Sequence, residues 1–337
     1  MAVDTKIQWC DSTINPTMGC DGCELWKPIN GVKTCYAGLL HDRYGSRNKG
    51  YSSSFDKLTV WPGRMEKSSR WPDLAGKDRV SKPWLNGLPR LIFVSDMSDA
   101  FSADVTFDYL RSEVITAATS EQGRRHRYLW LTKRPQIMAK FSSWLEDKGG
   151  WPENIWAGTS VTGPATTSRI TPLLDVGNDS TIRFVSLEPQ FQEVDLTSWL
   201  PDLDWVIQGG ASGPRATTQP FDIAWARTLL EICSQPGMPS YFLKQLGSNP
   251  VHGGVPVSLK DRHGGDWSQW PAELADLKVR LMPIQPVVPG DISTPVAPPD
   301  SKCATSATQD AALKRRRHDA AVKAWDTRRR RATTSKD

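Results

Sequence analysis

The sequence predicts an α/β protein whose core is a partial (β/α) TIM-like barrel of about six to seven parallel strands. Six short apolar runs, rich in β-branched and aromatic residues, begin roughly 22 to 37 residues apart, which leaves room for a loop, a helix and a return in each unit. The runs are continuously hydrophobic rather than alternating, as expected for parallel strands covered on both faces. They span residues 91–95, 128–132, 155–159, 182–187, 205–208 and 240–243.

Further elements are expected between and before these runs. A seventh strand is predicted at residues 7–9, ahead of the first cysteines. Helices are predicted at residues 36–44, 107–119 and 222–233. In the last of these, apolar residues recur at helical spacing and include Cys233, which we therefore expect to be buried and not a ligand.

Polar residues follow each predicted strand. In a parallel barrel these positions lie together at the carboxyl ends of the strands, where the active sites of such barrels are found. Each polar residue taken alone is also ordinary helix-capping chemistry, so the prediction rests on unlike charged groups recurring at six successive strand ends. The segments are 95–99, 132–135, 159–160, 186–189, 209–213 and 244–245.

The composition is that of a water-soluble globular protein, with 38% hydrophobic residues and a mean hydropathy of −0.46. No apolar run approaches the roughly 20 residues that span a bilayer, and the N-terminus lacks the apolar core of a signal peptide. We therefore expect a cytoplasmic protein with no membrane contact. In that reducing compartment the six cysteines are metal ligands or free thiols, not disulfides.

The charge is uneven along the chain. Residues 302–337 hold eleven Lys or Arg against four Asp, a net of +7, whereas the whole chain carries +5. We expect a barrel domain over residues 1–283 with an insert at 45–89, either a lid or a small subdomain. A Pro-rich linker over 284–310 and a disordered basic tail over 311–337 follow.

Three cysteines near the N-terminus carry the strongest chemical signal. Cys20 and Cys23 are separated by two residues on a glycine-rich loop, and Cys35 follows after eleven more. Three thiolates suit an iron–sulfur cluster in which one iron stays open for a ligand. A structural zinc site needs a fourth ligand, for which His41 is the candidate; Cys10 is a spare thiol.

Several short blocks resemble the phage-associated radical-SAM-like proteins that carry an N-terminal three-cysteine motif. The resemblance covers roughly residues 4–283. It lies in Asn15-Pro16 with Gly19-Cys20, Cys35-Tyr36-Ala37, and the blocks at 93–99, 131–135, 154–158, 188–189, 205–210 and 244–245. The cysteine spacing, two residues and then eleven, differs from the usual three and then two of radical-SAM proteins.

The resemblance implies a [4Fe–4S] cluster held by Cys20, Cys23 and Cys35, with S-adenosylmethionine bound to the open iron through its amino and carboxylate groups. Reduction by an electron donor such as flavodoxin or ferredoxin would then give a 5′-deoxyadenosyl radical. Tyr36 would pack beside the cluster. Candidate contacts to the ribose and carboxylate of S-adenosylmethionine are Ser160, Gly209, Gly210 and Ser212.

Lys133, Arg134, Glu188 and Lys244, at strand ends, are the candidate catalytic and substrate-binding residues. The alternative for them is ion pairing with Asp96, Asp99 and Glu188. Clustered arginines in the tail favour nucleic acid as a partner, which predicts an enzyme acting on a nucleic acid base or nucleotide. The alternatives are a non-catalytic zinc-binding nucleic-acid module and a phage accessory protein.

Overall fold

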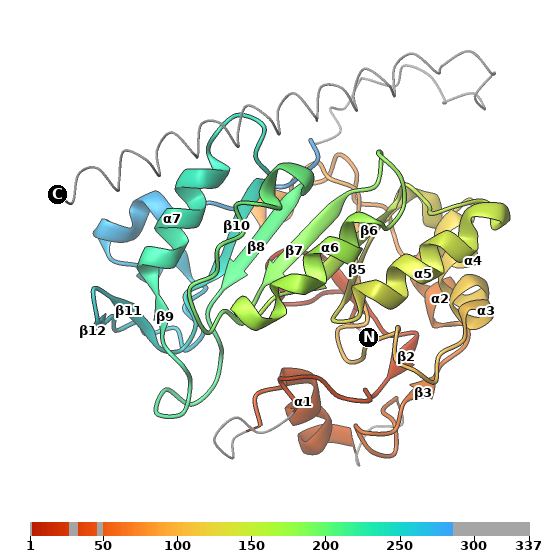
Figure 1. Ribbon diagram of the computed structural model, residues 1–337, viewed down its shortest axis with the longest axis horizontal. Helices are drawn as coiled ribbons and strands as arrows, with labels where there is room; N and C mark the ends of the chain where they lie inside the picture. The colour runs from red at the N-terminus through yellow and green to blue at the C-terminus, as the bar shows by residue number, and fades with distance from the viewer. Residues whose placement is uncertain (1, 27–32, 46–49, 286–337) are drawn as a thin grey trace.

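A seven-stranded, all-parallel sheet curls into a half-barrel and forms the centre of the molecule (Figure 1). The computed structural model describes residues 2–26, 33–45 and 50–285. The strand order is β1-β4-β5-β6-β7-β8-β10, so neighbouring strands follow one another along the chain. Every pairing in this sheet is parallel, and the predicted partial barrel is therefore confirmed. The strands are β1 (Ser12–Ile14), β4 (Leu91–Val94), β5 (Arg127–Thr132), β6 (Ile155–Ser160), β7 (Arg183–Leu187), β8 (Trp205–Gly209) and β10 (Ser240–Gln245).

Short strands and seven α-helices complete the described part of the fold. The small strands are β2 (Thr17–Met18) with β3 (Thr59–Val60), and β9 (Phe221–Asp222) with β11 (Pro250–His252) and β12 (Val255–Pro256). The helices are α1 (Tyr36–Tyr44), α2 (Arg64–Ser69), α3 (Phe107–Leu110), α4 (Thr116–Thr119), α5 (Pro135–Leu145), α6 (Ile170–Leu174) and α7 (Ile223–Cys233). A π-helical turn, Arg111–Ile115, joins α3 to α4. All three predicted helices are therefore confirmed, and Cys233 is buried as expected.

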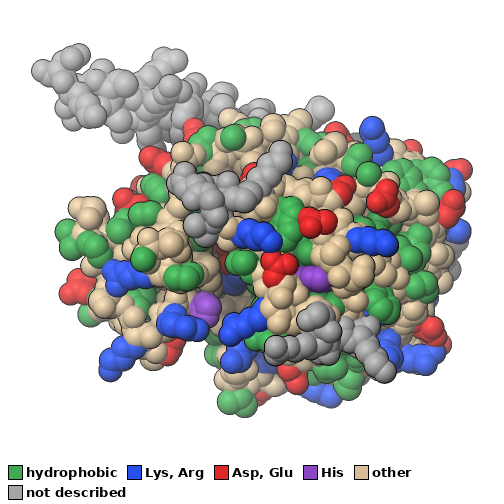
Figure 2. All heavy atoms as spheres, turned by 90° about the horizontal axis from the view of Figure 1, so that it is seen from below, with side chains coloured by type: hydrophobic (Ala, Val, Ile, Leu, Met, Phe, Trp, Pro, Cys, Tyr) green, Lys and Arg blue, Asp and Glu red, His purple; other side chains and the backbone are tan. Residues whose placement is uncertain are grey.

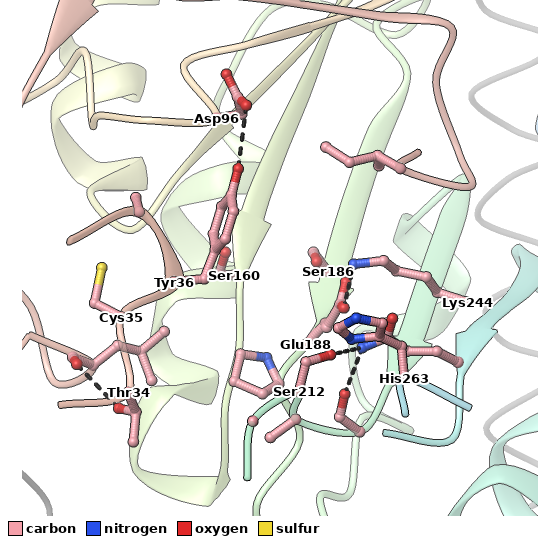
Figure 3. A pocket seen from close by; sticks show the side chains of 18 of the residues that line it. Thr34, Cys35, Tyr36, Asp96, Ser160, Ser186, Glu188, Ser212, Lys244 and His263 are labelled. Carbon is pink, nitrogen blue, oxygen red and sulfur yellow. Dashed lines mark hydrogen bonds and ion pairs between the residues drawn. The ribbon is translucent and has the colours of Figure 1, made fainter. Parts of the chain in front are cut away.

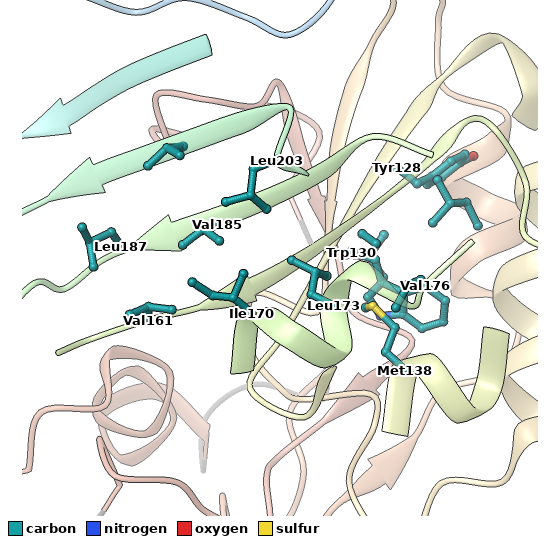
Figure 4. Close-up of a cluster of buried hydrophobic side chains, with 14 of the residues drawn as sticks. Tyr128, Trp130, Met138, Val161, Ile170, Leu173, Val176, Val185, Leu187 and Leu203 are labelled. Atoms are coloured by element: carbon teal, nitrogen blue, oxygen red, sulfur yellow. The ribbon is translucent and has the colours of Figure 1, made fainter. Parts of the chain in front are cut away.

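The strands bury both of their faces, which explains why their sequences are continuously apolar. On β4, Ile92 and Val94 face the helical layer, whereas Leu91 and Phe93 face the inside of the barrel. Helices α5 and α6 pack over β5 to β7 and form the larger core, which Figure 4 shows around Trp130.

Aromatic side chains fill the inside of the half-barrel below the carboxyl ends of the strands. The Trp9 ring lies 4.5 Å from that of Phe93, and the Trp205 ring meets Phe242 edge to face at 5.7 Å. Gly158 in β6 has no side chain because the Phe184 ring occupies that space: a Cβ there would lie 2.2 Å from the ring. The floor of the barrel is thus closed, and open space remains only toward the strand ends.

The predicted strand at residues 7–9 is wrong. That stretch forms turns, and the edge strand is β1, whose Ser12 pairs with Ile92 of β4. The apolar residues there are explained by Trp9, which is 2% exposed and packs into the barrel interior from a loop. β1 itself is short and carries hydroxyl groups, so it gives no strand signal of its own.

The insert predicted at residues 45–89 packs against both the cysteine segment and the barrel, and its Phe55 shares a small buried cluster with Met18 and Cys20. Its Met65 is fully buried in the outer core, while Leu85 and Leu88 pack inside the barrel. The predicted tail and nearly all of the linker lie outside the described residues. Within the described part of the chain, no helix is long and apolar enough to cross a membrane.

Candidate active site at the carboxyl ends of the strands

A cavity of about 1500 Å³ opens at the carboxyl ends of the strands, and Figure 2 shows a hollow on this face of the molecule. It lies between the barrel and the segment that carries the cysteines and α1. Eleven of the twelve predicted site residues line it, whereas Gly209 does not. The eleven are Cys20, Cys23, Cys35, Tyr36, Lys133, Arg134, Ser160, Glu188, Gly210, Ser212 and Lys244.

Strand periodicity explains why residues so far apart in the sequence meet here. Side chains two apart on a strand share a face, so Lys133 continues the inward series of β5 and Ser160 that of β6. Glu188 follows Phe184 and Ser186 on the inner face of β7, and Lys244 follows Phe242 on β10. The buried residues within each strand therefore determine which face of the sheet the polar side chains at the strand end point to.

The three thiols lie at one end of the cavity. Cys20 is 8% exposed, and burial raises its pKa to about 11, although the Gly22 N–H, 3.4 Å from the sulfur, opposes the shift. Burial also raises the pKa of Cys35, which precedes α1; the backbone N–H of Gly38 partly offsets that shift. Cys23 is half-buried. All three are free thiols, and the raised pKa values of Cys20 and Cys35 favour the protonated form of these two.

The three thiols lie near one another at the same end of the cavity. Cys23 is close enough to Cys20 and to Cys35 to raise the pKa of both. Yet in the described chain no three His, Cys, Asp or Glu side chains are grouped to hold one metal ion. A [4Fe–4S] cluster binds each thiolate at a different iron, so its ligands need not converge on one point. The proposed fourth zinc ligand, His41, instead bonds through Nε2 to the Ser52 carbonyl at 2.9 Å.

A carboxylate lies near the thiols without a cationic partner among the described residues. Asp96 accepts hydrogen bonds from Asn15 Nδ2 at 2.5 Å and from the Tyr36 hydroxyl at 3.2 Å, and burial raises its pKa (Figure 3). The preceding Ser95 has a left-handed backbone (φ 70°), and its buried hydroxyl has no hydrogen-bond partner. This strand end is thus held in an unusual conformation beside an unpaired acid.

The opposite end of the cavity is built from β7, β8 and β10. Glu188 and Lys244 form an ion pair there, and Figure 3 shows both side chains directed into the cavity. Gln245 donates from Nε2 to the Ser212 hydroxyl at 2.8 Å and to the Gly210 carbonyl at 2.9 Å. The glycine is needed at this crossing, because a Cβ on Gly210 would lie 2.4 Å from the Leu246 carbonyl oxygen.

The expected alternative of ion pairing holds for some of the strand-end charges and not for others. Arg134 pairs with Asp99 at 3.0 Å, and Lys244 pairs with Glu188. Lys133 lines the cavity but its ammonium group has no ion pair within the described part of the chain. Its backbone N–H donates to Asp99 instead, at 2.9 Å.

A comparison with known families places the chain. The model of one family, described as "Protein of unknown function (DUF5131)", matches residues 4–332. The chain belongs to the DUF5131 family. No curated protein and no solved structure matches it. Because the family description carries no activity, the function of this DUF5131 protein is argued from its site.

Two carboxylates of the cysteine loop were missed in the sequence, and they fasten that loop to the barrel of this DUF5131 protein. Asp21 pairs with Arg134, which also donates to the Gly22 carbonyl at 2.8 Å. Glu24 pairs with Arg169, which follows β6. The signal was present as acids interleaved with the cysteines, but their arginine partners are more than 100 residues away in the chain.

Proposed function

We propose that this DUF5131 protein is a radical S-adenosylmethionine enzyme that acts on a nucleic acid base or nucleotide. One observation carries the proposal. Three free thiols of an N-terminal loop, Cys20, Cys23 and Cys35, share one cavity with charged residues from four barrel strands. The resemblance to phage-associated radical-SAM-like proteins supports it independently of that geometry.

Cys20, Cys23 and Cys35 would hold a [4Fe–4S] cluster, and the three-thiolate set leaves one iron for S-adenosylmethionine. When bound and reduced, that cluster supplies the electron that cleaves the sulfonium to a 5′-deoxyadenosyl radical. The Asp96 carboxylate, which lines the same cavity, would accept a hydrogen bond from the amino group of S-adenosylmethionine. Ser160 remains a proposed contact to its ribose, whereas Gly209 does not line the cavity and Gly210 and Ser212 lie at the opposite end, near Glu188 and Lys244.

The residues at the other end would bind the group that reacts. Glu188 and Lys244 present an acceptor beside a donor, a pattern that matches the polar edge of a heterocyclic base. Lys133, which forms no ion pair among the described residues, adds positive charge for an anionic substrate, whereas Arg134 is already paired with Asp21 and Asp99. The aromatic floor, with Trp9 and Phe93, keeps water from entering from below.

The proposed partners follow from this chemistry. A reduced flavodoxin or ferredoxin in the cytoplasm would supply the electron. The basic tail over residues 311–337, which lies outside the described residues, would attract nucleic acid.

Anaerobic reconstitution with iron and sulfide tests the proposal. We expect roughly four irons per chain and, after S-adenosylmethionine and dithionite are added, formation of 5′-deoxyadenosine. Cys20→Ala, Cys23→Ala and Cys35→Ala should lose both. Cys233→Ala is the matched control, because that thiol is buried on α7 and should change neither. A colourless protein that holds one zinc and gives no product would refute the proposal.

A further inference from the structure

Two loops beside the cavity mouth carry exposed basic side chains and lie against each other. Ser248 joins them: its hydroxyl donates to the Arg262 carbonyl at 2.6 Å and accepts from the Gly213 N–H at 3.0 Å. The first loop, residues 211–219, follows β8; the second, residues 257–266, follows β12. Residues of both loops line the cavity. We call the exposed side chains of Arg215, Lys260, Arg262 and His263 the distal basic rim.

Arg215, Lys260 and Arg262 supply the positive charge of this rim, whereas the His263 ring interacts electrostatically with Asp261. None of the four forms an ion pair among the described residues. Asp261 accepts backbone N–H groups from His263 at 3.0 Å, Gly265 at 2.7 Å and Asp266 at 2.9 Å. Asp266 is engaged in the same way by Ser268. The acids therefore fold the loop while the cations face solvent, and Figure 2 shows Lys and Arg side chains around the hollow.

The cavity has room for more than one small molecule. Its volume of about 1500 Å³ exceeds the roughly 300–1000 Å³ of a typical small-molecule site. If S-adenosylmethionine occupies the thiol end, the end near Glu188 and Lys244 is free for a second group. A base that is part of a strand reaches such a depth only when it leaves the stack, and its backbone then stays at the mouth. His263 of the distal basic rim lines the cavity, and Arg215, Lys260 and Arg262 are next in the chain to the lining residues Pro214, Ala216 and Asp261.

We propose that the distal basic rim binds the phosphate backbone of a nucleic acid strand while one unstacked base enters the cavity. The identity of the base as the reacting group rests on the proposed function. Binding of the backbone does not, since it requires neither the cluster nor S-adenosylmethionine. The ligand class is therefore a polynucleotide and not a free nucleotide, which would leave the rim without phosphates to neutralise.

Fluorescence anisotropy tests the proposal. It measures the affinity of the metal-free protein for a labelled single-stranded DNA of mixed sequence at several salt concentrations. The rim variant combines Arg215→Ala, Lys260→Ala and Arg262→Ala. The matched control combines Arg111→Ala, Arg124→Ala and Lys140→Ala, which removes the same charge from exposed residues on helical elements outside the two loops. Both keep the basic tail, so its contribution cancels.

Each phosphate contact adds about 0.7 to the slope of log affinity against log salt for a single strand, so three lost contacts reduce the slope by about 2. Between about 50 and 200 mM salt, the wild-type chain and the control should lose roughly 20-fold more affinity than the rim variant. Equal slopes for the rim variant and the control would overturn the proposal. This binding measurement does not depend on 5′-deoxyadenosine formation. The proposal for the distal basic rim can therefore be refuted separately from the proposed radical S-adenosylmethionine activity.

Discussion

Arg169 holds Glu24 through two parallel hydrogen bonds, from Nη1 to Oε1 at 2.9 Å and from Nη2 to Oε2 at 2.6 Å. The pair connects the segment after β6 to the residue that follows Cys23. Arg169 also donates to the Ser160 carbonyl at 3.1 Å, and Thr162 donates to Glu24 at 3.2 Å. The cysteine loop is therefore fastened to the barrel by protein contacts alone, before any metal binds. Such an arrangement orders the ligands in advance.

Arg169→Lys should loosen the cysteine loop, because lysine keeps the charge but cannot form both parallel bonds. We expect the free energy of unfolding to fall by about 1–2 kcal/mol and iron retention after reconstitution to fall as well. The rate at which a thiol reagent modifies Cys23 in the metal-free protein should rise. Arg70→Lys, at an exposed pair with Glu66, is the control and should change none of these. An unchanged rate in Arg169→Lys would contradict this role.

Gly158→Ala should destabilise the barrel. A methyl group at this position in β6 would meet the Phe184 ring, so either the ring or the strand must move. Overpacking of this kind costs about 1–3 kcal/mol. Urea unfolding measures the change. Gly50→Ala is the control, because its Cβ would meet only the end of the flexible Arg64 side chain at 3.5 Å.

Buried His126 should make the fold less stable in mild acid. Burial lowers its pKa to about 4, from 6.5, and its Nε2 lies 3.1 Å from the Ser69 carbonyl oxygen. As the pH falls from 6.5 toward 4, the unfolded chain takes up a proton that the folded chain does not. Its contribution is thus complete above pH 6.5 and is lost on acidification, at up to about 3 kcal/mol. His126→Gln should flatten this part of the curve of unfolding free energy against pH; an unchanged curve would exclude His126 as its source.

Asp96→Asn should weaken binding of S-adenosylmethionine to the reconstituted protein by roughly tenfold or more, because a neutral amide accepts a hydrogen bond from the amino group less strongly than a carboxylate does. Glu188→Gln, at the opposite end of the cavity, should leave that affinity nearly unchanged and impair the substrate instead. Equilibrium dialysis with S-adenosylmethionine measures both variants. The opposite order of effects would reverse the assignment of the two ends of the cavity.

Much of the barrel could be predicted because its signal is local. Six strands buried on both faces appear as apolar runs, and α7 has a recognisable start at Asp222, whose side chain accepts a hydrogen bond from the Ala224 N–H. β1 could not be found this way. It is a three-residue strand of Ser, Thr and Ile whose place is set by pairing with β4, while the nearby Trp9 serves the core from a loop.

By itself, the sequence determined the candidate site residues: three cysteines on one loop and charged residues at successive strand ends. The alternation of side chains along buried strands already placed Lys133, Ser160, Glu188 and Lys244 on the inner face. Only the tertiary structure decided which of these charges are paired. It joined Glu24 to Arg169 and Asp21 to Arg134, whereas Asp96 forms no ion pair with a side chain among the described residues and is instead hydrogen-bonded by Tyr36. These ion pairs depend on how loops distant in the sequence meet at the carboxyl ends of the strands, and no local sequence pattern indicates which loops will meet.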